Sequence, residues 1–416
     1  MNNKRLGKVI WAPILLVISY LIITQLAYLY TDGLNDNVIL TLIYTSINYF
    51  SIFVGYISYD VSKYRIYNEK FVNMDKCIIM CALCTIVISI YNIKAFYPDV
   101  STILTYIFDP GSAYEYVKYM NRNQLIVRSQ GILHSMIGIL LTVLTFTKYY
   151  LFGFLILFWK EINKSTKYIG ILSVVIYLVH TFLIGAMVNI GTLAISMIPL
   201  LIYIYYYKSI RMNKLKRAKL IFKIVTSILI AFILLLYFMG SRDVFKLKDG
   251  RDTAVLISGL LGFIFYISHG YSGLAQCLYL PFVFTGGYTT FKGIYETIGP
   301  YLGVENLFIN SYLMRNQIET GRSALQVWST IFPWLASDIS FILVPFVMFI
   351  VGYLLKTTWK NGIKTNNPFA LIITGQLLVL CFMIPANNQL FHTFGNSIGT
   401  IIMTVLYIKS KRFIRS

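Results

Sequence analysis

The chain has 416 residues, of which 57% are hydrophobic and only 12% are charged. Soluble domains of this length keep a large polar exterior, so this composition excludes a soluble globular protein. Repeated apolar runs of about 20 residues are long enough to cross the roughly 30 Å hydrocarbon layer of a bilayer. The sequence therefore predicts an all-α fold, a polytopic transmembrane helix bundle. The net charge of +20 would indicate a nucleic-acid partner in a soluble protein, but membrane proteins concentrate Lys and Arg in their cytoplasmic loops.

The hydropathy and charge pattern predicts about ten membrane helices. The basic start MNNKRLGK and the basic tail KSKRFIRS predict that both termini are cytoplasmic. The helix expected over 131–158 is long enough to require tilt or a break, and Thr147 is one candidate position for a break. In chain order, the expected helices cover residues 9–29, 38–58, 77–93, 131–158, 168–187, 189–207, 220–240, 335–355, 368–384 and 394–409.

The segments outside these helices divide sharply by charge. Almost all of the net positive charge lies in segments expected to face the cytoplasm, and the remaining segments are nearly balanced. This distribution follows the positive-inside rule and needs no nucleic-acid partner. It predicts three parts: a membrane domain of seven helices over 1–240, a large external loop over 241–334, and a second membrane domain with three helices and the tail over 335–416.

Two apolar runs in the large loop leave the number of crossings open. Residues 254–268 are apolar enough to half-cross a bilayer, and residues 273–287 nearly so. If only one run crossed fully, every later loop would change sides, so we expect both or neither to cross. Their glycines and Pro281 favour short interfacial or re-entrant helices, which membranes tolerate where protein or water lines the backbone.

The cysteines predict neither a redox centre nor a metal site. Cys81 and Cys84 have the spacing of a ligand pair, but the chain has no second pair, so we interpret them as small packing residues of a membrane helix. No internal or inverted repeat is evident, which disfavours a transporter.

Three sequence segments carry a family resemblance. SHGYSGLAQCLYLPFVFTGG (268–287), WSTIFPWLASDISF (328–341) and MIPANNQ (383–389) resemble the Wzy-type O-antigen polymerases, which join oligosaccharide repeat units. The resemblance covers chiefly the C-terminal 40% of the chain. It implies a GT-C-like multi-helix architecture with a large periplasmic loop in the bacterial inner membrane.

The resemblance also implies a reaction and partners. Such enzymes transfer a growing glycan from undecaprenyl diphosphate onto a new undecaprenyl-diphosphate-linked repeat unit at the periplasmic face, making O-antigen or capsule. No cofactor, nucleotide sugar or metal is implied. A chain-length regulator and a flippase of the same pathway are the implied protein partners.

A lipid diphosphate leaving group requires cations where water is partly excluded, and arginine contacts phosphate oxygens bidentately. We therefore predict catalytic roles for Arg251, Arg315 and Arg322, with an ordinary solvated or headgroup-facing arginine as the alternative at each position. Asp338, at the mouth of a predicted helix, is the candidate general base. Its alternative role is to start that helix or to pair with an arginine.

Six further residues are predicted to bind substrate. His269, Tyr271 and Lys292 lie in the large loop, and the amides of Asn387 and Asn388 suit sugar hydroxyls or helix caps. Lys148 lies within a predicted helix, where a lone ammonium is costly, so it either reaches a lipid phosphate or extends to the interface.

Two other functions remain open at this stage. An O-antigen ligase would use a similar donor and a different acceptor. A lipid-linked oligosaccharide flippase would show two similar halves and short loops on both faces, whereas this chain has one dominant loop.

Overall fold

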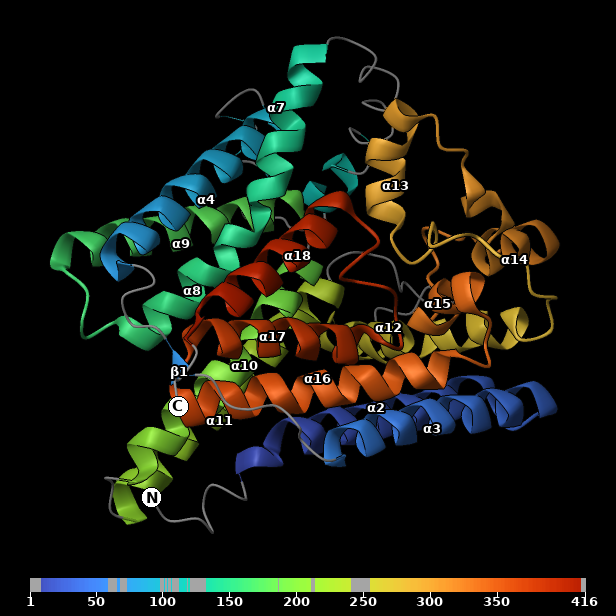
Figure 1. Cartoon of the computed structure of the whole chain (residues 1–416), viewed down its shortest axis with the longest axis horizontal. Helices are drawn as coiled ribbons and strands as arrows, with labels where there is room; N and C mark the ends of the chain where they lie inside the picture. The colour runs from blue at the N-terminus through green and yellow to red at the C-terminus, as the bar shows by residue number, and fades with distance from the viewer. Residues whose placement is uncertain are drawn as a thin grey trace. The chain divides into compact units, whose positions relative to one another are not determined.

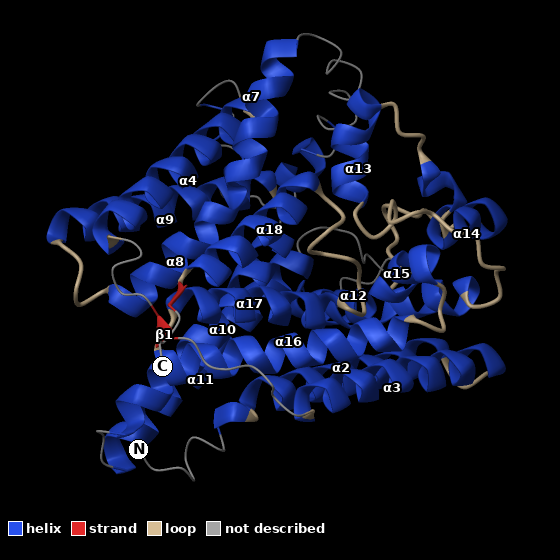
Figure 2. Cartoon of the chain, viewed as in Figure 1, coloured by secondary structure: helices blue, strands red, loops and turns tan. Residues whose placement is uncertain are grey.

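The structure is a computed structural model. It describes residues 9–58, 66–67, 73–97, 101, 103, 106, 112–117, 119, 132–185, 187–210, 214–240 and 255–412. The described residues are almost entirely helical (Figure 2), as the composition predicts. They form two compact units: unit 1 contains Met1–Phe71 and Ile264–Ser416, and unit 2 contains Val72–Phe263. This grouping differs from the expected division at 240 and 334, because the first two helices pack with the C-terminal part of the chain.

Unit 1 contains the regions that resemble the polymerases. It begins with α2 (Ala12–Asp32) and α3 (Asp36–Ile57) and continues with the second half of α12 (Val255–Cys277). The short elements that follow are α13 (Lys292–Ile298), η2 (Gly299–Leu302), η3 (Leu307–Asn310), α14 (Tyr312–Thr320) and α15 (Ile331–Ile339). The last helices are α16 (Val344–Thr365), α17 (Pro368–Met383) and α18 (Phe394–Lys409). Two short strands, β1 (Ile66–Tyr67) and β2 (Lys411–Arg412), pair antiparallel with Ile66 opposite Arg412.

Unit 2 is built from the central helices. They are α4 (Met74–Phe96), α7 (Ile132–Val143), η1 (Leu144–Phe146), α8 (Thr147–Phe158), α9 (Lys164–Ile184), α10 (Met187–Ile210), α11 (Lys214–Gly240) and the first part of α12. The helix expected over 131–158 is indeed interrupted, since the 3₁₀ turn η1 separates α7 from α8 immediately before Thr147.

Seven helical segments among the described residues are long and apolar enough to cross a membrane, or eight if α15 and α16 form one bent span. Their outward-facing side chains are apolar: on α2, for example, Leu15, Ile23 and Leu26 are all more than half exposed. The predicted polytopic helix bundle is therefore confirmed, and the chain is a multi-pass membrane protein. The last two expected helices have their predicted bounds to within one residue, but they are short for spans. α17 and α18 have 16 residues each, or about 24 Å at 1.5 Å per residue, less than the width of the hydrocarbon layer.

The expectation of short helices over 254–287 is wrong. Residues 255–277 form the single helix α12, and 278–291 are turns and irregular chain. Glycines do not break this helix because they serve close packing instead. A Cβ added at Gly270 would lie 1.9 Å from the carbonyl oxygen of Pro385, and one at Gly273 would lie 2.4 Å from the hydroxyl of Ser329. Small residues of this kind are characteristic of membrane helix contacts.

The single helix expected over 335–355 is replaced in the structure by two helices, α15 and α16. α15 ends at Ile339, the next residue Ser340 has a positive φ of 69°, and α16 starts at Val344 at an angle of 118° to α15. A non-glycine residue at positive φ is uncommon and is retained where the surroundings hold it. Pro345 lies in the first turn of α16, where its missing N–H costs no helical hydrogen bond. The result is a short, buried helix that precedes a long one.

α3 and α16 run parallel and pack closely, and Figure 1 shows them beside α2. A Cβ added at Gly55 or Gly352 would lie 2.0 Å from a backbone oxygen of the facing helix. Tyr44 donates to the carbonyl of Phe341 near one end of the pair, and Lys356 donates to the carbonyl of Ser58 near the other. These two hydrogen bonds lie toward opposite ends of the α3–α16 pair and so distinguish two ends of unit 1.

One end of unit 1 is basic. It contains the β1–β2 ladder together with Lys356, Lys360, Lys364 and Lys411. We call the opposite end the loop end. There, Ser272 and Tyr279 of the α12 region donate to Asp32 and Asn37 of the α2–α3 turn. The C-terminal end of α12 and the start of α16 therefore lie at the same end as this turn.

Candidate functional site

The three segments that carry the resemblance meet at the loop end of unit 1. The Thr330 N–H donates to the carbonyl of Gly270 over 3.2 Å, and the Ile331 N–H donates to the carbonyl of Ile384 over 2.9 Å. Gly270 also touches the backbone of Pro385, as its packing shows. Residues 384–390 are non-helical and buried. Buried irregular backbone needs hydrogen-bond partners, and the contacts with Thr330, Ile331 and Gly270 hold this segment inside unit 1.

Arg322 lies at this junction. Its Nη2 donates to the carbonyl of His269 over 2.5 Å and to the carbonyl of Trp328 over 3.3 Å. Its Nε is buried and has no hydrogen-bond partner among the described residues. Burial lowers the pKa of Arg322 below its usual value, although the nearby carboxylate of Asp32 opposes this shift. Arg322 therefore brings a partly desolvated positive charge, with one donor still unused, to the place where the three segments meet.

Asp338 is buried and anchors the loop over 285–290. Its Oδ1 accepts hydrogen bonds from the hydroxyl of Thr285 and from the Gly287 N–H at 2.8 Å, and its Oδ2 accepts one from the Thr290 N–H at 2.7 Å. Gly286 and Gly287 both have positive φ, so the loop needs glycine to wrap around the carboxylate. Because both oxygens already accept hydrogen bonds from the loop, the geometry favours a positioning role for Asp338. The general-base role stays a prediction.

Asn388 completes the support of the same loop. Its Nδ2 donates to the carbonyl of Thr290 over 2.7 Å, while its Oδ1 is buried without a partner among the described residues. The Oδ1 of Asn387 is likewise buried and unpartnered there. The two amides predicted to contact sugar are thus inside the protein, beside the loop that Asp338 holds. Their unused oxygens are available to a hydroxyl or to water.

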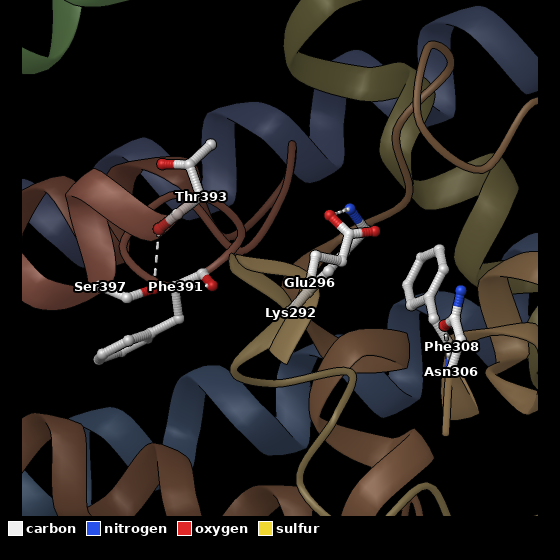
Figure 3. Close-up of polar contacts among 7 residues, drawn as sticks. All are labelled: Lys292, Glu296, Asn306, Phe308, Phe391, Thr393 and Ser397. Carbon is white, nitrogen blue, oxygen red and sulfur yellow. Dashed lines mark hydrogen bonds and ion pairs between the residues drawn. The ribbon is translucent and has the colours of Figure 1, made fainter. Parts of the chain in front are cut away.

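Lys292 forms an ion pair within α13. Its ammonium donates to the carboxylate of Glu296 one turn later, and its side chain is only 8% exposed. The ammonium also lies 5.1 Å from the centre of the Phe308 ring, whose backbone N–H donates to the side chain of Asn306. Figure 3 shows these four side chains. Since Glu296 compensates its charge, Lys292 is less suited than Arg322 to binding an anion.

Figure 3 also shows the turn that precedes α18. The Ser397 hydroxyl lies within hydrogen-bond distance of the carbonyls of Phe391 and Thr393, at 3.0 and 2.8 Å. The Gly293 N–H donates to the same Phe391 carbonyl over 3.2 Å. A Cβ added at Gly293 would collide with the backbone of Thr393. These contacts connect the Lys292 helix to the Asn387–Asn388 turn.

His269 and Tyr271 have mainly packing contacts. The His269 ring lies 5.2 Å from that of Phe265, and its Nδ1 is 3.0 Å from the Phe265 carbonyl. The hydroxyl of Tyr271 shares hydrogen bonds with those of Thr24 and Tyr49, and Tyr271 is fully buried between α12, α2 and α3. At the junction, His269 contributes its backbone carbonyl, which accepts a hydrogen bond from Arg322.

The remaining predicted residues lie elsewhere. Arg315, on α14, donates from Nε to the Asn310 carbonyl over 3.0 Å and lies 4.9 Å from the Tyr312 ring, while its Nη2 is buried without a partner among the described residues. Lys148 belongs to unit 2. Arg251 lies outside the described residues.

The region around the junction contains several buried polar atoms that lack a partner among the described residues. They include donors and acceptors alike: Arg322 Nε, Thr330 Oγ1, Trp334 Nε1, Asn387 Oδ1 and Asn388 Oδ1. Each would cost about 1–3 kcal/mol if left unsatisfied, so water or a bound molecule is expected to pair with them. Sequence reasoning had assigned no role to Thr330 or Trp334. The sequence signal that could have identified them is the presence of a hydroxyl and an indole N–H within the apolar run STIFPW.

His392, in the turn that follows α17, lies beside the same junction. Its ring lies 5.2 Å from that of Trp328, edge to face, and its Nδ1 is 3.0 Å from the Asn388 carbonyl. Burial lowers the pKa of His392 to about 4. At neutral pH this histidine is therefore uncharged, and Arg322 supplies the charge at the junction. Among the described residues, no group of three or more His, Cys, Asp or Glu side chains could hold a metal ion.

Comparison of the chain with models of known protein families, with curated proteins and with solved structures found no match. The polymerase family therefore stays a prediction from the three segments quoted above.

Proposed function

We propose that this protein is a polymerase of lipid-linked oligosaccharide repeat units, acting at the periplasmic face of the bacterial inner membrane. Its substrates are glycans carried on undecaprenyl diphosphate, and its product is O-antigen or capsule polysaccharide. The observation that carries this proposal is the convergence at the loop end. The segments of 268–287, 328–341 and 383–389, far apart in the chain, contact one another around Arg322.

The chemistry of the junction suits this reaction. A hydroxyl oxygen of the acceptor sugar bonds to the anomeric carbon of the donor glycan. The bond from that carbon to the diphosphate oxygen breaks, the diphosphate keeps the bonding electrons, and the hydroxyl proton is released to a base or to water. Arg322, in a partly desolvated position, is suited to stabilise the negative charge that develops on the leaving group. The amide oxygens of Asn387 and Asn388 and the hydroxyl of Thr330 are groups of the kind that bind sugar hydroxyls.

The two ends of unit 1 support the proposed side of the membrane. From the positive-inside rule we expect the basic end to face the cytoplasm. The junction lies toward the opposite end, together with the α2–α3 turn. A single cysteine in place of exposed Asn310 tests this directly, and we expect labelling by a membrane-impermeant maleimide from outside. Labelling only from the cytosolic side would remove the polymerase assignment.

A flippase is the second candidate, because one observation favours it. The 118° bend between α15 and α16 is typical of the discontinuous helices of transporters. Deletion of the gene, followed by gel analysis of the polysaccharide, separates the possibilities. A polymerase mutant retains single repeat units on the acceptor, whereas a ligase or flippase mutant loses the attached glycan completely. We expect the single-unit product.

A further inference from the structure

A second polar cluster lies in unit 2, within the membrane-spanning segments. Lys148, near the middle of the span Ile137–Phe158, has its ammonium 5.7 Å from the centre of the Tyr177 ring and 5.2 Å from that of Tyr149. One turn along α9 from Tyr177, the His180 ring lies 6.3 Å from the Tyr177 ring. These side chains come from α8 and α9, which contact each other and α4.

The polar groups of α9 in this cluster are buried and unused. The hydroxyl of Tyr177 and both ring nitrogens of His180 have no hydrogen-bond partner among the described residues, although Tyr177 is only 5% exposed and His180 only 7%. A neutral imidazole always carries one N–H donor, and a phenol carries one O–H donor. Groups of this kind are rarely left unsatisfied inside a protein, so a polar molecule is expected beside them.

Among the described residues, the helices around Lys148 offer its ammonium no counter-ion. The sequences of α7, α8, α9 and α10 contain no acidic residue. In α4 the only acid is Asp75, in the first turn, where its carboxylate accepts hydrogen bonds from the N–H of Asn163 and the hydroxyl of Thr166. The two tyrosine rings attract the ammonium through their faces but do not neutralise its charge. A membrane-embedded lysine without an anionic partner is costly and is characteristic of a functional site.

We propose that Lys148, Tyr177 and His180 form a binding site for a phosphate-type anion within unit 2. An ammonium, a phenol O–H and an imidazole N–H together supply several donors and one positive charge, which matches an anion with several oxygens. The bilayer presents such an anion as the phosphate of a lipid, and the solvent presents it as free phosphate. This inference does not depend on the proposed polymerase function.

The test uses the full chain, purified in phosphate-free detergent, and titration calorimetry with farnesyl phosphate and with inorganic phosphate. Binding of farnesyl phosphate alone indicates a lipid phosphate as the ligand, and binding of inorganic phosphate indicates a free anion. We expect Lys148→Met to weaken binding by at least about 10-fold, because it removes the charged partner of the hydrogen bonds. Tyr177→Phe and His180→Phe, which each remove one donor, should weaken it by up to about 10-fold.

Three controls keep the test decisive. Lys164→Met makes the same substitution at an exposed lysine at the start of α9 and should leave binding unchanged. Lys148→Arg keeps the charge and should retain binding. Arg322→Ala alters the junction of unit 1 and should leave this site intact, so that failure of one proposal is distinguishable from failure of the other. Equal affinity of the wild type and Lys148→Met, or binding of neither probe by the wild type, would overturn the proposed anion site.

Discussion

Asp338 and Asn388 hold the two backbone groups of the same residue, Thr290. The carboxylate of Asp338 accepts the Thr290 N–H over 2.7 Å, and the amide of Asn388 donates to the Thr290 carbonyl over 2.7 Å. One side chain comes from α15 and the other from the turn after α17. Through this residue, two distant parts of the chain fix the 285–290 loop beside the junction, so a change at either side chain is expected to displace it.

Replacing Asp338 by Asn should destabilise the protein as well as lower its polymer production. The new amide N–H₂ would face donors from the 285–290 loop, and the charge that strengthens their hydrogen bonds would be lost. We expect a loss of at least about 2 kcal/mol in the free energy of unfolding. Thermal unfolding in detergent measures this, with Glu305→Gln as the control at an exposed acid. Unchanged stability together with lost polymer would identify Asp338 as a catalytic base instead.

Arg322→Ala should shorten the polymer, because it removes the positive charge from the junction. Loss of one preorganised charge-stabilising donor typically lowers the rate on the order of 100-fold. Arg322→Lys should be nearly as severe, since a lysine cannot place one planar fork between the His269 and Trp328 carbonyls. Chain-length ladders on polysaccharide gels report the effect. Lys364→Ala, at an exposed lysine of the basic end, should leave the ladder unchanged.

Arg315→Ala and Arg251→Ala test the other two predicted arginines in the same assay. Each is expected to shorten the polymer while the protein still inserts into the membrane. Arg315 has a buried Nη2 available to a ligand, and Arg251 is predicted from the sequence alone. Wild-type ladders from all three arginine variants would eliminate the proposal that cations stabilise the lipid diphosphate.

Gly270→Ala should be severely destabilising. Its new methyl group would lie 1.9 Å from the Pro385 carbonyl oxygen, which belongs to backbone and cannot rotate away. The added methyl must therefore push α12 from the buried turn, and overpacking of this kind costs about 1–3 kcal/mol or more. Yield and thermal stability in detergent measure the effect. Gly191→Ala, where no atom lies within 4 Å of the added methyl, is the matched helical control and should be neutral or slightly stabilising.

His392 should make the protein sensitive to acid. Burial lowers its pKa in the folded protein to about 4, below the value of about 6.5 expected in the unfolded chain. The unfolded chain therefore binds a proton first as the pH falls. The stability associated with neutral His392 is fully present above about pH 6.5 and is lost progressively toward pH 4, by about 3 kcal/mol in total.

His392→Phe keeps an aromatic ring beside Trp328 and removes the titration. Comparison of unfolding temperatures from pH 7.5 to 4.5 should show a shallower decline for the variant than for the wild type, because all other titrating groups are shared. Parallel curves would show that His392 is not protected from protonation in the folded protein.

The sequence by itself determined the helical membrane fold, because apolar runs and loop charges are local properties that depend on the bilayer and not on neighbouring helices. It also indicated the three segments that meet and the arginine beside them. Only the tertiary structure decided that 255–277 form one helix, since the glycines that suggested breaks are contact points with Pro385 and Ser329. It likewise decided that Asp338 and Asn388 hold Thr290. Such roles depend on which groups lie opposite one another after folding, and residues 48 and 98 positions apart in the chain carry no local signal of that.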